Sequence, residues 1–110
     1  MPFYLYQLTY SKDAVKAMVA SPSDREAAAR KLIEALGGKL HHMFFAFGQS
    51  DVICLIEGPD DTFMMAGAAA VASTGTVSAS STTKLMTSAD AMAAMTLAGK
   101  VTGAYTPPHG

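Results

Sequence analysis

Two adjacent histidines are the residues in this chain whose chemistry most readily serves catalysis. His41 and His42 lie in a predicted strand beside Met43, and an imidazole in apolar surroundings can act as a general acid or base near neutral pH. Successive side chains of a strand point to opposite faces, so we expect the two imidazoles on opposite faces of the sheet and no shared metal ion. A structural histidine near a strand end is the alternative interpretation.

Asp51 is the third candidate catalytic residue. It follows the predicted turn at residues 48–50 and opens an apolar strand, where a carboxylate at the mouth of a pocket could take part in acid–base chemistry. The Gly-x-x-Asp spacing is also typical of an aspartate that caps the turn through backbone contacts. The turn chemistry favours this second interpretation.

A ladder of hydroxyl groups marks the last predicted strand, residues 76–86. Alternate residues from Thr76 to Thr82 carry hydroxyls on the same face as Lys84, and together they offer donors, acceptors and one positive charge to a small polar or anionic ligand. An exposed edge strand protected by polar residues is the alternative. The predicted ligand-binding residues are Tyr4, Tyr6, Phe45, Ser78, Thr82 and Lys84.

The elements that must position these residues alternate along the chain. Alternating and aromatic-rich patterns predict strands, whereas apolar residues at helical spacing predict helices, one of them opened by a capping box at Ser23 and Glu26. Residues 11–21 are interpreted as a short amphipathic or irregular linker. The predicted strands are 3–10, 39–47, 51–57 and 76–86, and the predicted helices are 23–36, 62–73 and 88–97.

This order, β-α-β-β-α-β with a terminal helix, predicts an α+β protein with a ferredoxin-like antiparallel sheet and two helices on one face. Residues 1–97 form the single predicted domain, and the Gly- and Pro-containing residues 98–110 are expected to be a flexible tail. The predicted hairpin at 39–57 is apolar on both faces. We therefore expect the open sheet face to be covered by a second subunit.

The distribution of charge supports self-association. Charged residues make up 15% of the 110 residues, against about 25% in an average domain. Only Lys84, Asp90 and Lys100 lie beyond residue 61. A surface with so little charge is expected to contact another subunit.

Several function classes are excluded by composition. The net charge of -1 and the absence of a basic patch argue against a nucleic-acid partner. The single cysteine, Cys54, forms no internal disulfide and belongs to no zinc pattern. No signal peptide or membrane span is recognised, so we expect a cytoplasmic protein without a membrane partner. No cofactor motif is present, and the methionines follow no metal-binding pattern.

Three sequence blocks, at residues 34–41, 47–51 and 57–61, resemble the GYD-domain family. The resemblance extends over roughly residues 3–95, although Gln49 and Ser50 occupy positions where the family usually has an acidic and an aromatic residue. It implies a small bacterial protein with a ferredoxin-like, dimeric α+β barrel-type fold and no assigned substrate.

The sequence supports two classes of function. The first is a homo-oligomer that binds a small molecule in a cavity between sheets; in its catalytic form it is a cofactor-independent oxygenase or isomerase that uses His41 or His42, Tyr4, Asp51 and Lys84. The second is a non-catalytic assembly or sensor subunit. A cavity approached by His41, Tyr4 and Lys84 together would favour the first class.

Overall fold

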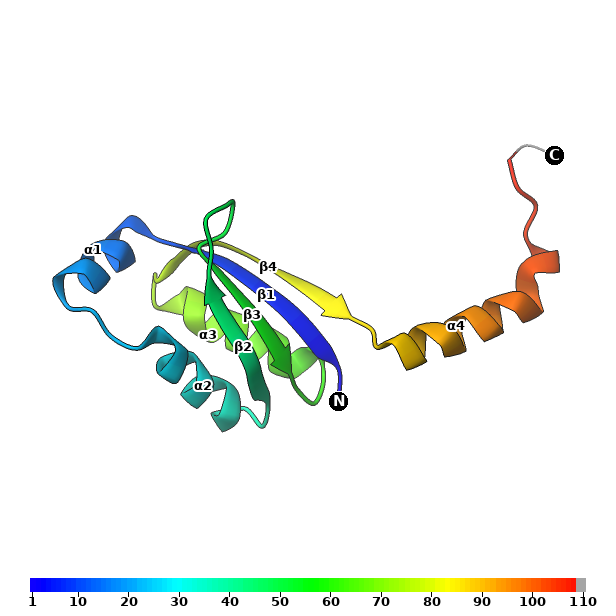
Figure 1. Cartoon of the computed structure of the whole chain (residues 1–110), viewed down its shortest axis with the longest axis horizontal. Helices are drawn as coiled ribbons and strands as arrows, with labels where there is room; N and C mark the ends of the chain where they lie inside the picture. The colour runs from blue at the N-terminus through cyan, green and yellow to red at the C-terminus, as the bar shows by residue number, and fades with distance from the viewer. Residues whose placement is uncertain (109–110) are drawn as a thin grey trace.

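The computed structural model describes residues 1–108 and contains the predicted succession of strands and helices (Figure 1). One helix, α1, lies within residues 11–21, which were interpreted as a short amphipathic or irregular linker, and the other boundaries lie close to those expected. The elements are β1 (Phe3–Tyr10), α1 (Lys12–Ala20), α2 (Arg25–Ala35), β2 (Lys39–Phe45), β3 (Val52–Glu57), α3 (Asp61–Ser73), β4 (Val77–Leu85), α4 (Ser88–Val101) and the short 3₁₀ helix η1 (Thr102–Ala104).

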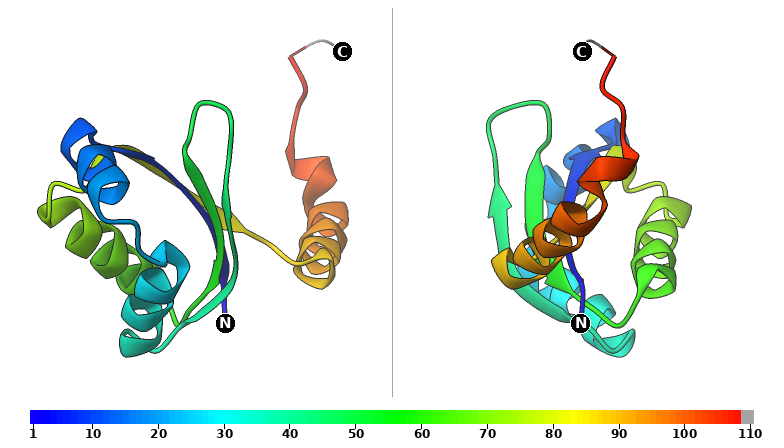
Figure 2. Two further views of the ribbon diagram at one scale, coloured as in Figure 1. Left: turned by 60° about the vertical axis from the view of Figure 1, so that its left-hand side comes forward. Right: turned by 90° about the vertical axis from the view of Figure 1, so that its right-hand side faces the viewer.

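The four strands form one antiparallel sheet in the order β2-β3-β1-β4. This order, with helices connecting β1 to β2 and β3 to β4, is the ferredoxin-like arrangement that the sequence predicts. The three helices α1, α2 and α3 lie on one side of the sheet, and α4 lies beyond the opposite side (Figure 2). We call these sides the covered face and the open face.

Alternation along the central strands separates the two faces. Tyr4, Tyr6 and Leu8 of β1 are buried on the covered face, and the register pairs Tyr6 with Cys54 of β3, which is also buried. The residues between them, such as Leu5, are only partly buried because no helix of this chain covers the open face. The core therefore lies between the sheet and α2 and α3.

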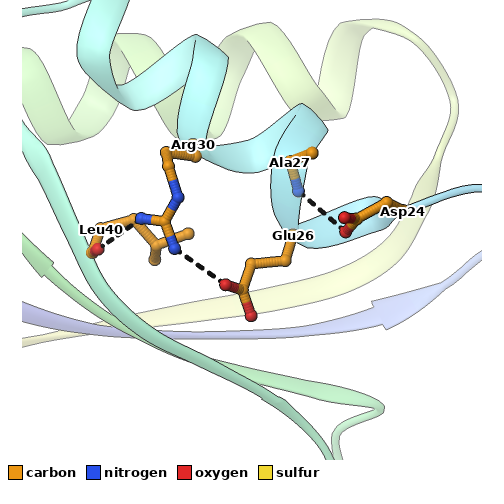
Figure 3. Close-up of polar contacts among 5 residues, drawn as sticks. All are labelled: Asp24, Glu26, Ala27, Arg30 and Leu40. Atoms are coloured by element: carbon orange, nitrogen blue, oxygen red, sulfur yellow. Dashed lines mark hydrogen bonds and ion pairs between the residues drawn. The ribbon is translucent and has the colours of Figure 1, made fainter.

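Helix α2 is fixed to the edge strand β2 by charged side chains (Figure 3). Asp24 caps the helix by accepting a 3.0 Å hydrogen bond from the Ala27 amide, and Arg30 donates to the Leu40 carbonyl oxygen at 2.9 Å. Arg30 also pairs with Glu26 at 2.8 Å. The predicted capping box at Ser23 was wrong: the cap lies one residue later, and the Glu26 side chain binds Arg30 instead.

Residues 12–20 form the helix α1 rather than an irregular linker. Ser11 accepts a hydrogen bond from the Ala14 amide and so satisfies an unpaired donor at the helix start. Ala14 and Met18 pack against the core from outside, but no residue of α1 is fully buried. The sequence signal was weak because only a narrow apolar stripe supports this helix.

A β-bulge interrupts β2 between Leu40 and His42. Leu40 faces Ile56 and Met43 faces Cys54, and both of these partners are buried on the covered face. His41 is the extra residue of the bulge. Uninterrupted alternation would put Phe44 on the same face as Leu40, but the bulge reverses which residues face the core beyond residue 41.

Helix α3 is less enclosed than its apolar sequence predicts. Only Phe63 and Met64 are buried, whereas Met65 is 70% exposed. Asp60 caps the helix by accepting a 2.9 Å hydrogen bond from the Phe63 amide. The outer side of α3 is thus apolar and open to solvent within this chain.

Helix α4 projects away from the rest of the chain as an arm (Figures 1 and 2). Thr87 caps it by accepting a hydrogen bond from the Asp90 amide, and the helix continues to Val101 rather than ending near residue 97. The first residues of the predicted tail are therefore helical. The radius of gyration is 18.2 Å, against about 13 Å for a compact domain of this length.

Candidate functional site

Both adjacent histidines lie on the open face, and the prediction of opposite faces was wrong. His41 Nε2 lies 2.8 Å from Glu57 Oε1, and its ring centroid is 5.7 Å from that of Phe3, an open-face residue. His42 pairs in register with Leu55 on the same face. The bulge at His41 places two consecutive side chains on one side of the strand.

The open face therefore presents a polar centre in apolar surroundings. The His41 and Glu57 side chains are only 26% and 22% exposed, and His42 stacks on Phe44 with ring centroids 6.0 Å apart. A carboxylate bonded to one ring nitrogen orients the imidazole, so the other nitrogen can donate or accept a proton. Sequence reasoning missed Glu57, whose position at the end of an otherwise apolar strand was the available signal.

Asp51 lies far from this polar centre. Glu57 and Val52 mark opposite ends of β3, so Asp51 is separated from the Glu57 end by roughly 16 Å or more of strand. Its Oδ2 atom accepts a 2.9 Å hydrogen bond from the Tyr10 amide, and its own amide donates to the Leu8 carbonyl oxygen. These contacts join Asp51 to β1 rather than to the turn at residues 48–50, so the turn-capping interpretation was wrong in its partner, and the structure does not bring Asp51 together with either histidine.

The hydroxyl ladder faces the helix side rather than the open side. The register of β4 pairs Thr82 with Tyr6 and Lys84 with Tyr4, both on the covered face. Ser78 lies at a bulge, where its hydroxyl donates weakly to the Thr9 and Tyr10 carbonyl oxygens. The expectation that the ladder and the histidines line one cavity between sheets was therefore wrong, because the strand alternation places them on opposite sides.

β4 is the edge strand that the alternative interpretation describes. Thr82 and Lys84 are exposed, as expected for polar residues of an edge strand. Phe45 is also at an edge of the covered face, 62% exposed and 6.2 Å from the Tyr10 ring. None of these three side chains is enclosed within a single chain.

A polar cluster links Tyr4, Asp61 and Lys84 at the start of α3. The Tyr4 hydroxyl donates to Asp61 Oδ1 at 2.6 Å, and Lys84 Nζ lies 3.0 Å from the same oxygen. Burial of the phenol, together with this carboxylate, raises the pKa of Tyr4 to about 12. The Tyr4 and Lys84 contacts lower the pKa of Asp61. All three groups are satisfied by one another, and the cluster fixes α3 to β1 and β4.

A cavity of about 370 Å³ lies between the covered face and helices α2 and α3. Its walls are mainly apolar and include buried Tyr6 and Cys54 from the sheet. Burial raises the pKa of the Cys54 thiol to about 11, so the thiol is protonated at neutral pH. The Tyr6 hydroxyl is buried and has no hydrogen-bond partner within the described chain.

Residues 1–108 hold no group of three or more His, Cys, Asp or Glu side chains arranged to bind a metal ion. None of the helices in these residues has the length and apolar character that a membrane span requires.

The GYD domain family model matches residues 4–95, and the chain belongs to this family. A solved structure described as "crystal structure of FFRP-DM1" has a TM-score of 0.48 and 10% sequence identity, and covers 78% of this chain and 100% of its own. No curated protein matches the chain.

Proposed function

We propose that this protein is the subunit of a homo-oligomer, which assembles through the open sheet face and α4 and binds a small molecule in the space enclosed between subunits. The observation that carries this proposal is the exposed state of α4. The helix has 14 residues, none of them buried. An isolated helix of this length is only marginally stable in water, and packing of an apolar face supplies most helical stability in proteins.

The side chains of α4 are suited to packing against another subunit. Met92, Met95 and Leu97 are 63–72% exposed, and Asp90 and Lys100 are the only charges of the helix. Methionine adapts to irregular apolar surfaces. In a single chain these side chains contact nothing that would remove them from water, so α4 requires a partner surface.

The open face of a second copy is the partner that this chain itself offers. The face is apolar along its centre, with Leu5, Ile53 and Leu55 only partly buried. Helix α4 leaves β4 on the same side of the sheet as this face (Figure 2). A second copy would therefore cover both apolar surfaces at once.

The His41–Glu57 pair supports a ligand site in the enclosed space. Once a second subunit covers the open face, these side chains and His42 become polar groups in an apolar enclosure, which is the usual composition of a small-molecule site. The 2.8 Å imidazole–carboxylate contact also favours the second candidate function, a cofactor-independent enzyme that uses His41 as the acid–base residue.

Sedimentation of the full chain tests the assembly. We expect an oligomer for the unmodified protein and a monomer for Leu55→Glu, because a buried carboxylate at the interface costs more than the lost contacts. Ala27→Glu, on the exposed side of α2, is the matched control and should remain oligomeric. A monomeric unmodified protein, or an oligomeric Leu55→Glu variant, contradicts the proposal.

Mass spectrometry of the assembled protein tests the ligand site. Small molecules that purify with the unmodified oligomer should be lost from the double variant His41→Ala, His42→Ala while the oligomer persists. Retention of the same molecules by the variant would place the binding site elsewhere. If the bound molecule is also converted chemically, conversion should stop in His41→Gln and continue in Asp51→Asn.

A further inference from the structure

We propose a second binding site, for a small and mainly apolar molecule that carries a carbonyl oxygen, in the cavity between the covered face and helices α2 and α3. This site lies on the opposite side of the sheet from the enclosed space between subunits. It is therefore independent of the assembly and can be tested on the monomeric Leu55→Glu variant as well as on the oligomer.

The size and walls of the cavity are those of a ligand site. Its volume of about 370 Å³ lies within the range of about 300–1,000 Å³ found for small-molecule pockets. Protein cores otherwise contain few voids larger than a water molecule. The cause is visible in the sequence of α3, which presents Gly67 and Ala68 to the cavity and so leaves a volume that larger side chains would fill.

The buried hydroxyl of Tyr6 specifies the polar part of the ligand. Tyr6 is only 5% exposed, lines the cavity, and its hydroxyl has no partner among the described residues. Buried polar groups in proteins are nearly always hydrogen-bonded. A phenol is a good donor, and Tyr4 on the same face shows the usual solution by donating to a carboxylate of the chain. Tyr6 lacks such an acceptor, so a carbonyl oxygen of a ligand is the complementary group.

Two polar side chains at the edge of the cavity indicate a route of entry. Arg25, at the start of α2, is partly exposed, and Thr74, at the end of α3, is exposed. The deeper walls are mainly apolar and include Met43 of β2 and Met64 of α3, together with the buried Tyr10. A ligand therefore enters beside Arg25 and Thr74 and places its apolar body between Met64 and the sheet, to which Met43 belongs.

Two probes of similar size and one smaller probe test this site by NMR titration of the methionine methyl groups. We expect 4-phenyl-2-butanone and butylbenzene to shift the Met43 and Met64 signals and to leave the Met92 signal of α4 unchanged. Acetone, which has the carbonyl group without the apolar body, should shift none of them at the same concentration.

Two variants separate the hydroxyl from the cavity. Tyr6→Phe should weaken binding of the ketone about 3- to 10-fold, the effect of one neutral hydrogen bond, and leave butylbenzene binding unchanged. Ala68→Phe, which fills the cavity, should abolish binding of both. Tyr105→Phe is the matched control, since Tyr105 is exposed and does not line the cavity, and should bind both probes as the unmodified protein does.

Two results would overturn the proposal. The first is a failure of both probes to shift the Met43 and Met64 signals. The second is a Tyr6→Phe variant whose affinities for the ketone and the hydrocarbon fall equally or not at all. A loss of ligands from the space between subunits in the histidine double variant bears on the proposed function alone.

Discussion

Val52 and Ile53 are neighbours in β3, yet they belong to the two different faces of the sheet. Val52 is completely buried under the helices, whereas Ile53 is partly exposed on the open face. The two side chains are almost equally apolar, so their different exposure reflects what the single chain can cover. The covered face is completed by α2 and α3, whereas no helix among the described residues covers the open face (Figure 2).

The largest expected effect comes from placing the same charge on each face in turn. Val52→Asp should unfold the chain, because an unpaired buried carboxylate costs on the order of 4–5 kcal/mol or more. Ile53→Asp should instead yield a folded monomer. Circular dichroism and sedimentation of both variants check this difference. A folded Val52→Asp variant, or an unfolded Ile53→Asp monomer, would break the distinction between the faces.

Removal of the arm should have the next largest effect. A chain ending after Thr87 lacks the exposed methionines of α4, and we expect its subunits to associate on the order of 100-fold more weakly, given a few buried apolar side chains. Sedimentation equilibrium measures the dissociation constant. A chain lacking only residues 106–110 is the control and should associate normally; equal weakening of both would assign the effect to the tail.

The reactivity of Cys54, which is buried on the covered face, reports directly on how well that face is closed. Because burial raises its pKa to about 11 from the ordinary 9.0, its thiolate fraction at pH 8 should be about 100-fold lower than that of a free cysteine. The rate of reaction with iodoacetamide should therefore be at least about 100-fold lower in the native protein than in about 8 M urea, which unfolds the chain. Similar rates would show that the covered face opens freely.

Alkaline pH should produce a smaller effect through Tyr4. Its pKa is about 12 in the folded protein and 10.0 ordinarily, so the native state holds this proton more tightly than the unfolded state does. The stabilising contribution is full below pH 10 and is lost as pH rises toward 12. Urea unfolding across this range should show a steeper loss for the unmodified protein than for Tyr4→Phe. Tyr105→Phe, at an exposed position, should behave as the unmodified protein.

The sequence predicted the fold well because strands and helices have strong local signals here. The aromatic-rich residues 3–10 form β1 with the expected bounds, and Gly37, with its positive φ of 86°, ends α2 at the predicted place. The apolar hairpin also indicated an uncovered face. These features depend on residue type and spacing within one element, which is what a sequence records.

The candidate site was predicted less well because its geometry depends on strand register. Nothing in the sequence around His41 marks a bulge, so both histidines could not be placed on one face beforehand. Tyr6 was predicted as a ligand-binding residue, but the expected cavity lay between sheets rather than under the helices. Arg25 and Glu57 were missed because each acquires its surroundings only from elements distant in the chain.

The bulge in β2 also has a consequence for how this strand tolerates changes of length. Because His41 is an extra residue, the side chains after residue 41 alternate between the two faces with the opposite phase to those before it. Deletion of His41 would remove the extra residue and leave a regularly alternating strand, in which Leu40 and Met43 stay on the covered face and His42 stays on the open face. The strand can therefore lose this residue without exchanging its faces, whereas deletion of any other single residue inside the strand would move the side chains on one side of the deletion to the opposite face.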